Sequence, residues 1–404
     1  MTVLLAVTCA VAVGNIYFPQ AIIPLIAAGL HTSPDSASVA VTATQLGYTA
    51  GMFLLVPLGD RLPHRSLLVA LLSLTGLALL AAGCAPTLPL LVAASALIGL
   101  ATVAAQVVGP LAAGLVAPER RGAVIGTLLS GSIGGMLLSR AFSGVLSEWL
   151  GWRAPYLVAA ALVLFLASIL ARTVPVTTPS SCQPYPALLA EALRLLRAEP
   201  DLRRSCFYQA TVFAGFSAVW TSLTLLLTGP VYGLGAQAVG LLALVGGGTM
   251  LCTPLAGRVV DRRGPDSVNL VCMLGVLFSA ALLTAGALGG APGLAALVAG
   301  TLLLDIAMQS GTVANQARIY ALRPDARSRL NTTYMTCAYL GGSAGSWLGV
   351  WTYGDAGWWG VCALVALLTM LALARHVVAL CGGKPGATGS RPRATAVDRP
   401  IAPR

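Results

Sequence analysis

The sequence predicts an all-α membrane protein with twelve transmembrane helices in two six-helix bundles, and two observations carry this prediction. The first is the composition: 57% of the 404 residues are hydrophobic and 9% are charged, with a mean hydropathy of +0.84. A soluble fold of this length needs far more charge to cover its surface, so most of the chain must lie in a bilayer. The second is a short charged motif that recurs in the second half of the chain, which indicates two similar bundles.

Twelve apolar runs come close to the ~20 residues that a helix needs to cross the hydrocarbon core. They begin near Val3, Val39, Ser66, Leu88, Gly122, Ala154, Cys206, Val239, Val268, Gly293, Thr332 and Gly360. The first run has no basic lead and polar residues interrupt it, so we expect a retained helix and not a cleaved signal. We expect a first bundle (1–172), a linker (173–205), a second bundle (206–381) and a disordered basic tail (382–404).

The formal net charge of +11 reports topology. Apart from Arg140 and Arg153, all Lys and Arg residues fall on one side of the predicted membrane topology. This positive-inside pattern predicts that both termini lie in the cytoplasm of a bacterium, with the chain in the plasma (inner) membrane, and it argues against a nucleic-acid partner. The nine Cys residues are scattered singly and the three His residues lie far apart, so we expect neither a metal site nor another cofactor.

The tenth span carries a polar stripe. Asp305, Gln309, Thr312 and Gln316 follow helical spacing in an otherwise apolar run, so this stripe should face water or protein and not lipid. A carboxyl at this depth costs several kcal/mol if it stays ionised and unpaired, so we expect it to be protonated, paired or in a wet cavity. A structural polar network between helices is the open alternative.

The first span holds Asn15, Tyr17, Pro19 and Gln20 in an aliphatic run. Pro19 removes a backbone hydrogen bond and should bend the helix. The three polar side chains are candidates for a solute cavity, although a kinked helix with polar packing to its neighbours explains each of them equally well.

The recurring motif follows the second span of each half. The first copy is PLGDRLPHR (Pro57–Arg65) and the second is GRVVDRRG (Gly257–Gly264), and aligning them pairs Asp60 with Asp261 and Arg61 with Arg262. The second copy resembles the loop signature of the major facilitator superfamily, which is Gly, three residues, Asp-Arg, one residue and Gly. The first copy departs from it, because Val56 and Pro63 replace the two glycines.

The resemblance covers all twelve spans and implies the major facilitator fold. It implies that Asp60, Arg61, Asp261 and Arg262 latch the two halves at the cytoplasmic face, with charges that only set topology and cap helices as the alternative. It also implies a cavity lined by spans one, four, seven and ten. We therefore predict substrate-binding residues at Asn15, Tyr17, Gln20, Gln106, Gln209, Trp220, Gln309 and Gln316. The aromatic stripe of span seven, which includes Trp220, can equally be packing.

The fifth span combines closely spaced glycines with a buried cation. The glycines, among them Gly131 and Gly135, allow close approach of another membrane helix. Arg140 lies too deep to reach either surface easily and needs an anion, water or carbonyl groups. The span looks like the fifth span of the drug:proton antiporter branch, but the Gly-Pro pair of that branch is missing, which leaves exchange open.

Asp305 and Arg140 are the intramembrane anion and cation that the sequence offers, and we predict that they couple transport to protons. Counting from the cytoplasmic ends places Arg140 at roughly 27 Å and Asp305 at roughly 18 Å depth, so a direct contact needs the long Arg side chain to reach inward. In the rival interpretation Arg140 binds an anionic substrate group or caps carbonyls. We also expect the linker segment ALLAEALRLLRAEPDLRR to form an amphipathic helix at the cytoplasmic membrane surface.

We therefore predict a monomeric secondary transporter, not an enzyme, that exports a small organic compound (a drug-like molecule, sugar or metabolite) through the bilayer by proton-coupled antiport. A proton-coupled uptake symporter or a facilitator uses the same fold and stays open. An intramembrane hydrolase is a weaker alternative: Gly341–Gly345 matches GxSxG around Ser343, but the match lies inside a membrane helix without an ordered His or acid partner. A membrane receptor that moves no solute is another.

Overall fold

The computed structural model describes residues 1–114, 121–175, 184–323 and 327–382, and this part of the chain is helical without a strand. Nine of its segments are long and apolar enough to cross a membrane. One of them, Arg329–Cys381, has 53 residues, or about 80 Å of helix, and must cross twice. Two further crossings come from α7 and from α11 with the start of α12, so the described helices make twelve crossings, as predicted.

The first six crossings form one half of the molecule. Its elements are α1 (Thr2–Tyr17), η1 (Phe18–Ile22), α2 (Ile23–Gly29), α3 (Pro34–Leu54), η2 (Val56–Asp60), α4 (His64–Gly83), α5 (Leu88–Ala101), α6 (Ala104–Gly114), α7 (Arg121–Leu150) and α8 (Ala154–Thr173). Pro19 cannot donate a backbone hydrogen bond, and the first crossing tightens around it into the 3₁₀ turn η1 before α2 continues.

The second half repeats this plan after a linker helix. Its elements are α9 (Tyr185–Ala198), α10 (Pro200–Thr228), α11 (Ala236–Val245), η4 (Gly246–Gly248), α12 (Thr249–Thr284), η5 (Ala285–Leu288), α13 (Gly290–Leu322) and α14 (Arg327–Gly382). Positive φ angles of 78° at Gly264 and 63° at Gly357 divide α12 and α14 into two crossings each. Of the predicted tail, only Gly382 belongs to the described residues.

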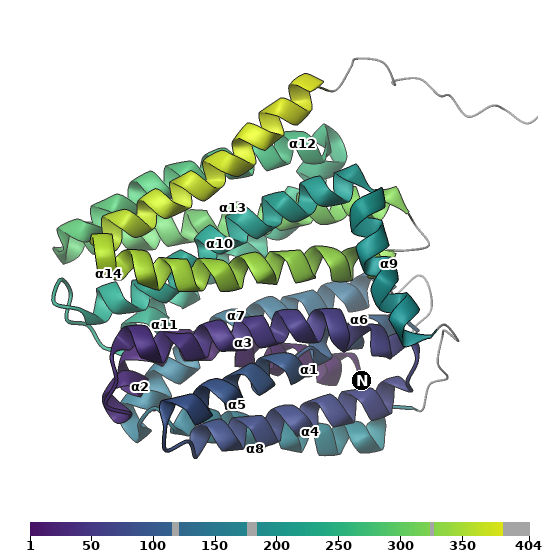
Figure 1. Ribbon diagram of the computed structural model, residues 1–404, viewed down its shortest axis with the longest axis horizontal. Coiled ribbons are helices and arrows are strands. Elements are labelled where there is room, and N and C mark those ends of the chain that lie inside the picture. The colour runs from purple at the N-terminus through teal and green to yellow at the C-terminus, as the bar shows by residue number, and fades with distance from the viewer. Residues whose placement is uncertain (115–120, 176–183, 324–326, 383–404) are drawn as a thin grey trace, which may run out of the picture.

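The two halves lie side by side with their helices roughly parallel (Figure 1). Small residues set the packing within each half: a Cβ at Gly135 of α7 would lie 2.1 Å from the main-chain oxygen of Ala10 in α1. A Cβ at Gly345 of α14 would lie 2.0 Å from the main-chain oxygen of Ala214 in α10. The predicted glycine faces therefore bring the fifth crossing onto the first and the eleventh onto the seventh, so the halves share one internal arrangement.

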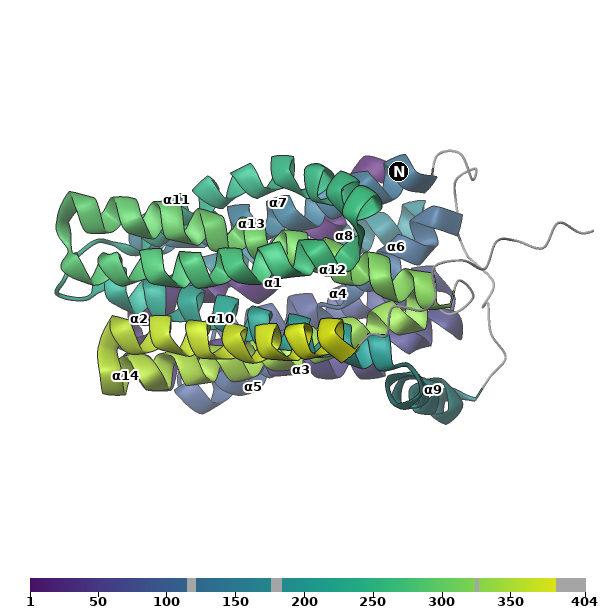
Figure 2. The same cartoon turned by 90° about the horizontal axis from the view of Figure 1, so that it is seen from above.

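Between the halves, α3 packs against α14, and α7 packs against α11. The first contact joins the second crossing to the eleventh, and the other joins the fifth to the eighth. Because the eighth crossing is the counterpart of the second and the eleventh is the counterpart of the fifth, the two contacts are equivalent under the pseudo-symmetry of the repeat. The linker helix α9 lies at one end of the molecule, the end at which the N-terminus also lies (Figures 1 and 2).

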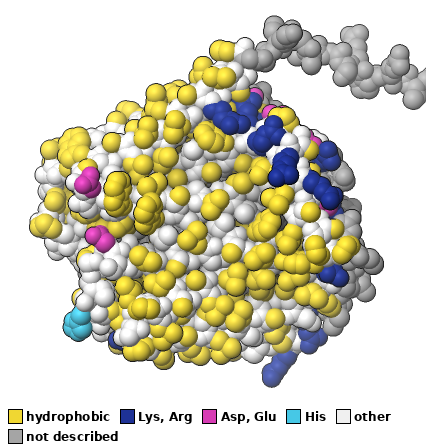
Figure 3. Space-filling model, viewed as in Figure 1, with side chains coloured by type: hydrophobic (Ala, Val, Ile, Leu, Met, Phe, Trp, Pro, Cys, Tyr) yellow, Lys and Arg dark blue, Asp and Glu magenta, His cyan; other side chains and the backbone are white. Residues whose placement is uncertain are grey.

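The surface has two distinct ends. Hydrophobic side chains cover the sides of the helices, while Lys and Arg gather at the end that carries α9 (Figure 3). We call this the basic end and the other the opposite end. Leu188, Ala192 and Leu195 of α9 are buried against the molecule while Arg194 and Arg197 are exposed, so α9 is an amphipathic helix.

Candidate functional site

A cavity of about 210 Å³ lies between the two halves. Its lining comes from α1, α3, α6 and α7 of the first half and from α10, α13 and α14 of the second: Val13, Tyr17, Tyr48, Gln106, Ser132, Ile133, Met136, Gln209, Phe213, Met308, Gln309, Thr312, Val313, Gln316, Met335, Ala338 and Tyr339. None of these described lining residues carries a charge. The cavity is thus a neutral chamber at the interface of the two halves.

Five of the predicted cavity residues line it, namely Tyr17, Gln106, Gln209, Gln309 and Gln316. The structure places the other three elsewhere. Asn15 faces a separate, apolar pocket between α1, α7 and α8, because it lies two positions before Tyr17 and so about 200° around the helix. Gln20 and Trp220 are buried, each 1% exposed, outside the cavity lining and next to Arg140.

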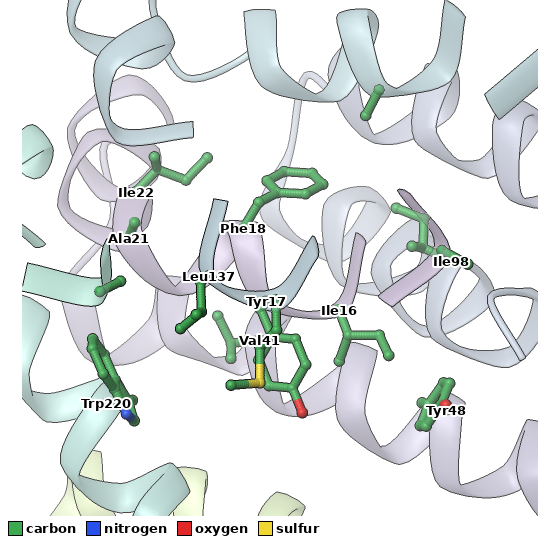
Figure 4. Packing of buried hydrophobic residues seen from close by; sticks show 14 of the residues in the cluster. Ile16, Tyr17, Phe18, Ala21, Ile22, Val41, Tyr48, Ile98, Leu137 and Trp220 are labelled. Carbon is green, nitrogen blue, oxygen red and sulfur yellow. The ribbon is translucent and has the colours of Figure 1, made fainter. Parts of the chain in front are cut away.

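Two tyrosines that the sequence did not single out, Tyr48 and Tyr339, join the halves across the cavity together with the predicted Tyr17. The hydroxyl groups of Tyr17 and Tyr339 lie 3.2 Å apart, and the ring of Tyr48 packs edge-on against that of Tyr339 at 4.5 Å. Gln106 donates a hydrogen bond of 3.2 Å to the Tyr48 hydroxyl. In the view of Figure 4 the ring of Tyr17 lies between those of Trp220 and Tyr48. The sequence did offer one indication of Tyr48 and Tyr339, because each is a tyrosine in the middle of an apolar span.

The polar stripe of α13 behaves as its spacing predicts. Thr312 accepts a hydrogen bond of 2.9 Å from Gln209, whose amide oxygen accepts another from Tyr334 at 2.8 Å. Gln316 donates to Asn331 at 3.4 Å. This wall of the cavity is a hydrogen-bonded surface.

Arg140 is fully buried, at 0% exposed, and it interacts with groups of both halves. Its Nε and Nη2 atoms donate to the Gln20 side-chain oxygen at 3.2 and 2.9 Å. The guanidinium carbon lies 4.3 Å from the ring centre of Trp220 and 5.0 Å from that of Tyr17, which is cation–π geometry. Its Nη1 is buried without a partner in the described part of the chain.

Asp305 lies on the other side of Trp220, 2% exposed. The Trp220 indole nitrogen donates a hydrogen bond of 3.1 Å to Asp305 Oδ1. The Oδ2 atom faces Gly246, where a Cβ would lie only 2.5 Å from it. Among the described residues, Arg140 and Asp305 form no direct ion pair. Trp220 contacts both of them, and their opposite charges attract each other. We call Gln20, Arg140, Trp220 and Asp305 the interface cluster.

The opposite end is closed by contacts between the halves. Thr224 of α10 donates to the main-chain oxygen of Gln20 at 2.8 Å, and the main-chain nitrogen of Gln237 donates to Glu148 at 2.9 Å. The helices α7 and α11 touch so closely that a Cβ at Gly240 would lie 2.5 Å from the Cα atom of Ala141. The interface cluster lies just inside this closure.

Toward the basic end, the cavity adjoins a second pocket. This smaller pocket of about 40 Å³ shares Gln106 with the central cavity and reaches His64, Leu188 and Arg329 under α9. Tyr185 ties α9 to the main chain of Leu54 at 2.6 Å. The linker is also tied to the second half, because Glu191 of α9 pairs with Arg329 and Glu199 pairs with Arg323 at 2.8 Å.

The predicted gating residues lie at the basic end. Arg61, Asp261 and Arg262 are exposed, and neither Asp261 nor Arg262 forms an ion pair with the described residues. Asp60 ends η2, and its side chain lies outside the described residues. Their latch role stays a prediction.

A twelve-crossing membrane protein with a neutral cavity between two pseudo-symmetric halves belongs to the class of solute transporters. The family model of the Major Facilitator Superfamily matches residues 3–297. This chain is a member of that superfamily, a multi-pass membrane transporter of small molecules and not an enzyme. Ser343 fits this conclusion, because the residue is 1% exposed and its hydroxyl donates to the main-chain oxygen of Tyr339 at 2.8 Å.

Several known proteins are similar. The "Putative uncharacterized transporter YgaY" of Escherichia coli is 35% identical over 374 residues, covering 92% of this chain and 94% of that one. The "Probable nitrate/nitrite transporter NarK2" of Mycobacterium tuberculosis is 32% identical over 267 residues, 63% of this chain and 65% of that one. The "Chloramphenicol resistance protein" of Streptomyces lividans is 28% identical over 244 residues, 60% of this chain and 62% of that one.

The fold is also that of a solved structure. The nucleoside transporter NupG superposes with a TM-score of 0.74 at 13% identity, covering 93% of this chain and 99% of that one. At this identity the likeness concerns the fold alone.

Proposed function

We propose that this protein is a proton-coupled secondary transporter that exports a small organic solute by alternating access, with its basic end and both termini in the cytoplasm of a bacterium. The observation that carries the proposal is the interface cluster: the buried cation belongs to one half, the buried acid to the other, and Trp220 connects them. Such charges are costly inside a membrane unless they serve function or are paired.

The closed opposite end and the pocket that adjoins the cavity toward the basic end support a state that faces the cytoplasm. A solute then reaches the cavity from the basic end, past Gln106. Rocking of the halves has to separate Arg140 from Trp220, because these residues lie on opposite sides of the interface. The protonation state of Asp305 therefore affects whether the opposite end stays closed.

Protonation supplies the coupling in this mechanism. With Asp305 ionised, its charge and the indole of Trp220 hold Arg140 against the second half. With Asp305 neutral, the attraction between the two buried charges is gone and the closure at the opposite end weakens. A proton can thus move the equilibrium between the two states because it changes the interaction energy in only one of them.

Export is the direction that the name of the Streptomyces lividans relative supports, since expelling a toxic compound is how a transporter confers resistance. It also agrees with the resemblance of the fifth crossing to that of drug:proton antiporters. Uptake by symport is the second candidate, because the same cytoplasm-facing state would release a solute that has been taken up.

The test uses purified protein in liposomes with an imposed pH gradient and an encapsulated panel of candidate solutes. We expect proton influx to drive solute out against its gradient, and Asp305→Asn to reduce this flux at least ~100-fold, since transition between states would no longer depend on a proton. The exposed acid Asp35 provides the matched control, Asp35→Asn, which should transport normally. Undiminished proton-driven flux in Asp305→Asn would remove the coupling role, and solute moving inward with protons would favour symport.

A further inference from the structure

We propose that the central cavity takes an uncharged solute that carries hydroxyl or amide groups on a compact ring, of the size of a monosaccharide or a nucleoside. This inference rests on the proposed function in one respect, namely that the cavity is the transport site. Its volume of about 210 Å³ falls below the roughly 300–1,000 Å³ of sites for drug-sized ligands.

The lining supports an uncharged solute directly. It contains four glutamine amides and five hydroxyl groups, and no described lining residue is acidic or basic. An ion brought into such a chamber gives up its hydration without gaining a counter-charge, which costs far more than transferring a neutral polar group that can be hydrogen-bonded.

An anion such as nitrate would need Arg140, the buried cation beside the lining residue Tyr17, but that guanidinium is not available to the cavity. Trp220 and Tyr17 cover it at 4.3 and 5.0 Å, and Gln20 takes hydrogen bonds from two of its three nitrogens. The negative charge of Asp305 already acts on it and would repel a second anion. The remaining nitrogen, Nη1, is buried away from the cavity lining.

A cation would need either Asp305 or open aromatic faces. Asp305 is not among the lining residues, and Trp220 and Gly246 cover its two oxygens. The aromatic rings at the cavity pack on one another: Tyr339 meets Tyr48 at 4.5 Å and Phe213 at 5.2 Å, both edge to face. They therefore do not form the open cage that binds a quaternary ammonium group.

Gln309 provides the strongest contact for a neutral solute. It lines the cavity one helical turn from Asp305, and it makes no hydrogen bond to the described part of the chain. Its amide can donate and accept at once, which matches a hydroxyl or an amide of a solute. A solute bound here lies next to the acid that the coupling mechanism requires.

The test measures binding at equilibrium, without a pH gradient, as the shift in thermal unfolding of the purified protein. The probes are uridine and glucose as neutral ring solutes, nitrate as an anion at matched ionic strength, and tetraphenylphosphonium as a cation. We expect uridine or glucose to stabilise the protein and the two ions not to do so. Gln309→Leu should weaken the neutral probe about tenfold, while Gln237→Leu, which changes only an exposed side chain and keeps the main-chain contact to Glu148, should leave it unchanged.

Stabilisation by nitrate or tetraphenylphosphonium alone, or by none of the four probes, would overturn the proposal, as would a neutral probe that binds Gln309→Leu as tightly as the parent. A neutral solute that binds but is not transported would leave this inference standing and would remove the proposed transport function.

Discussion

Two charge clusters differ in how their partners meet. In the second half, Asp266 pairs directly with both Arg204 and Arg318, and buried His376 lies within 3.2 Å of Arg204. We call these four residues the second-half cluster. In the interface cluster, Arg140 and Asp305 belong to different halves and connect through Trp220.

The difference follows from what each cluster must do. All members of the second-half cluster lie on α10, α12, α13 and α14, so a direct ion pair can persist through a cycle in which this half moves as a unit. A direct pair between the halves would have to be broken in each cycle, leaving two uncompensated charges in a low-dielectric setting. An indole between the two charges keeps them coupled, while separating the halves costs less free energy than breaking a direct ion pair would. We therefore propose that direct pairs belong to the half that moves as a unit and that the bridged pair belongs to the interface that moves.

The largest expected effect is on stability, in the second-half cluster. Asp266→Asn leaves two arginines, 14% and 8% exposed, without their shared carboxylate. We expect the free energy of unfolding to fall by about 1–3 kcal/mol, with the carboxylate's own 41% exposure limiting the loss. Chemical denaturation of the purified protein measures this change, and proton-driven flux per folded molecule should stay at the parent level. Lost coupling with unchanged stability would reverse the roles of the two clusters.

An intermediate effect is expected at Trp220. Trp220→Phe keeps an aromatic ring beneath Arg140 but removes the hydrogen bond to Asp305, worth about 1 kcal/mol, so proton-driven flux should fall about fivefold. Trp220→Leu also removes the cation–π contact and should lower the flux further. Liposome flux over a series of pH values measures both variants. Equal flux in Trp220→Phe and the parent would show that the indole does not transmit the coupling.

The smallest effect is expected from the exposed loop charges. Asp261→Asn should lower turnover by about twofold and shift cysteine accessibility at the basic end, while the binding constant of the solute stays constant, because an exposed charge contributes little unless the other state buries it. If cysteine accessibility at the basic end is the same in the variant and the parent, Asp261 has a role in topology alone.

The sequence predicted the fold well because lipid imposes a simple rule: apolar runs of sufficient length must be helices that span the membrane. It also identified Arg140 and Asp305, since each stands out against an apolar run. The position of Trp220 between Arg140 and Asp305 could not be predicted. Counting residues treats each helix as a straight rod and therefore places Arg140 and Asp305 at different depths in the membrane. The contact depends on the reach of the Arg side chain and on the small residue at Gly246.

Other residues escaped prediction for particular reasons. Asp266 lies just after the loop motif, where the charges Asp261 and Arg262 drew attention, and only the structure brings Arg204 and Arg318 to it. Tyr48 and Tyr339 sit in apolar runs where aromatic residues commonly serve as packing.

The most direct test of the bridged pair is a double-mutant cycle on proton-driven flux in liposomes, using Arg140→Gln, Asp305→Asn and the double variant. Because both residues act through one contact across the interface, the double variant should lose no more flux than the more damaging single variant, a departure from additivity of at least about fivefold. Losses that simply multiply would contradict the coupling of Arg140 and Asp305.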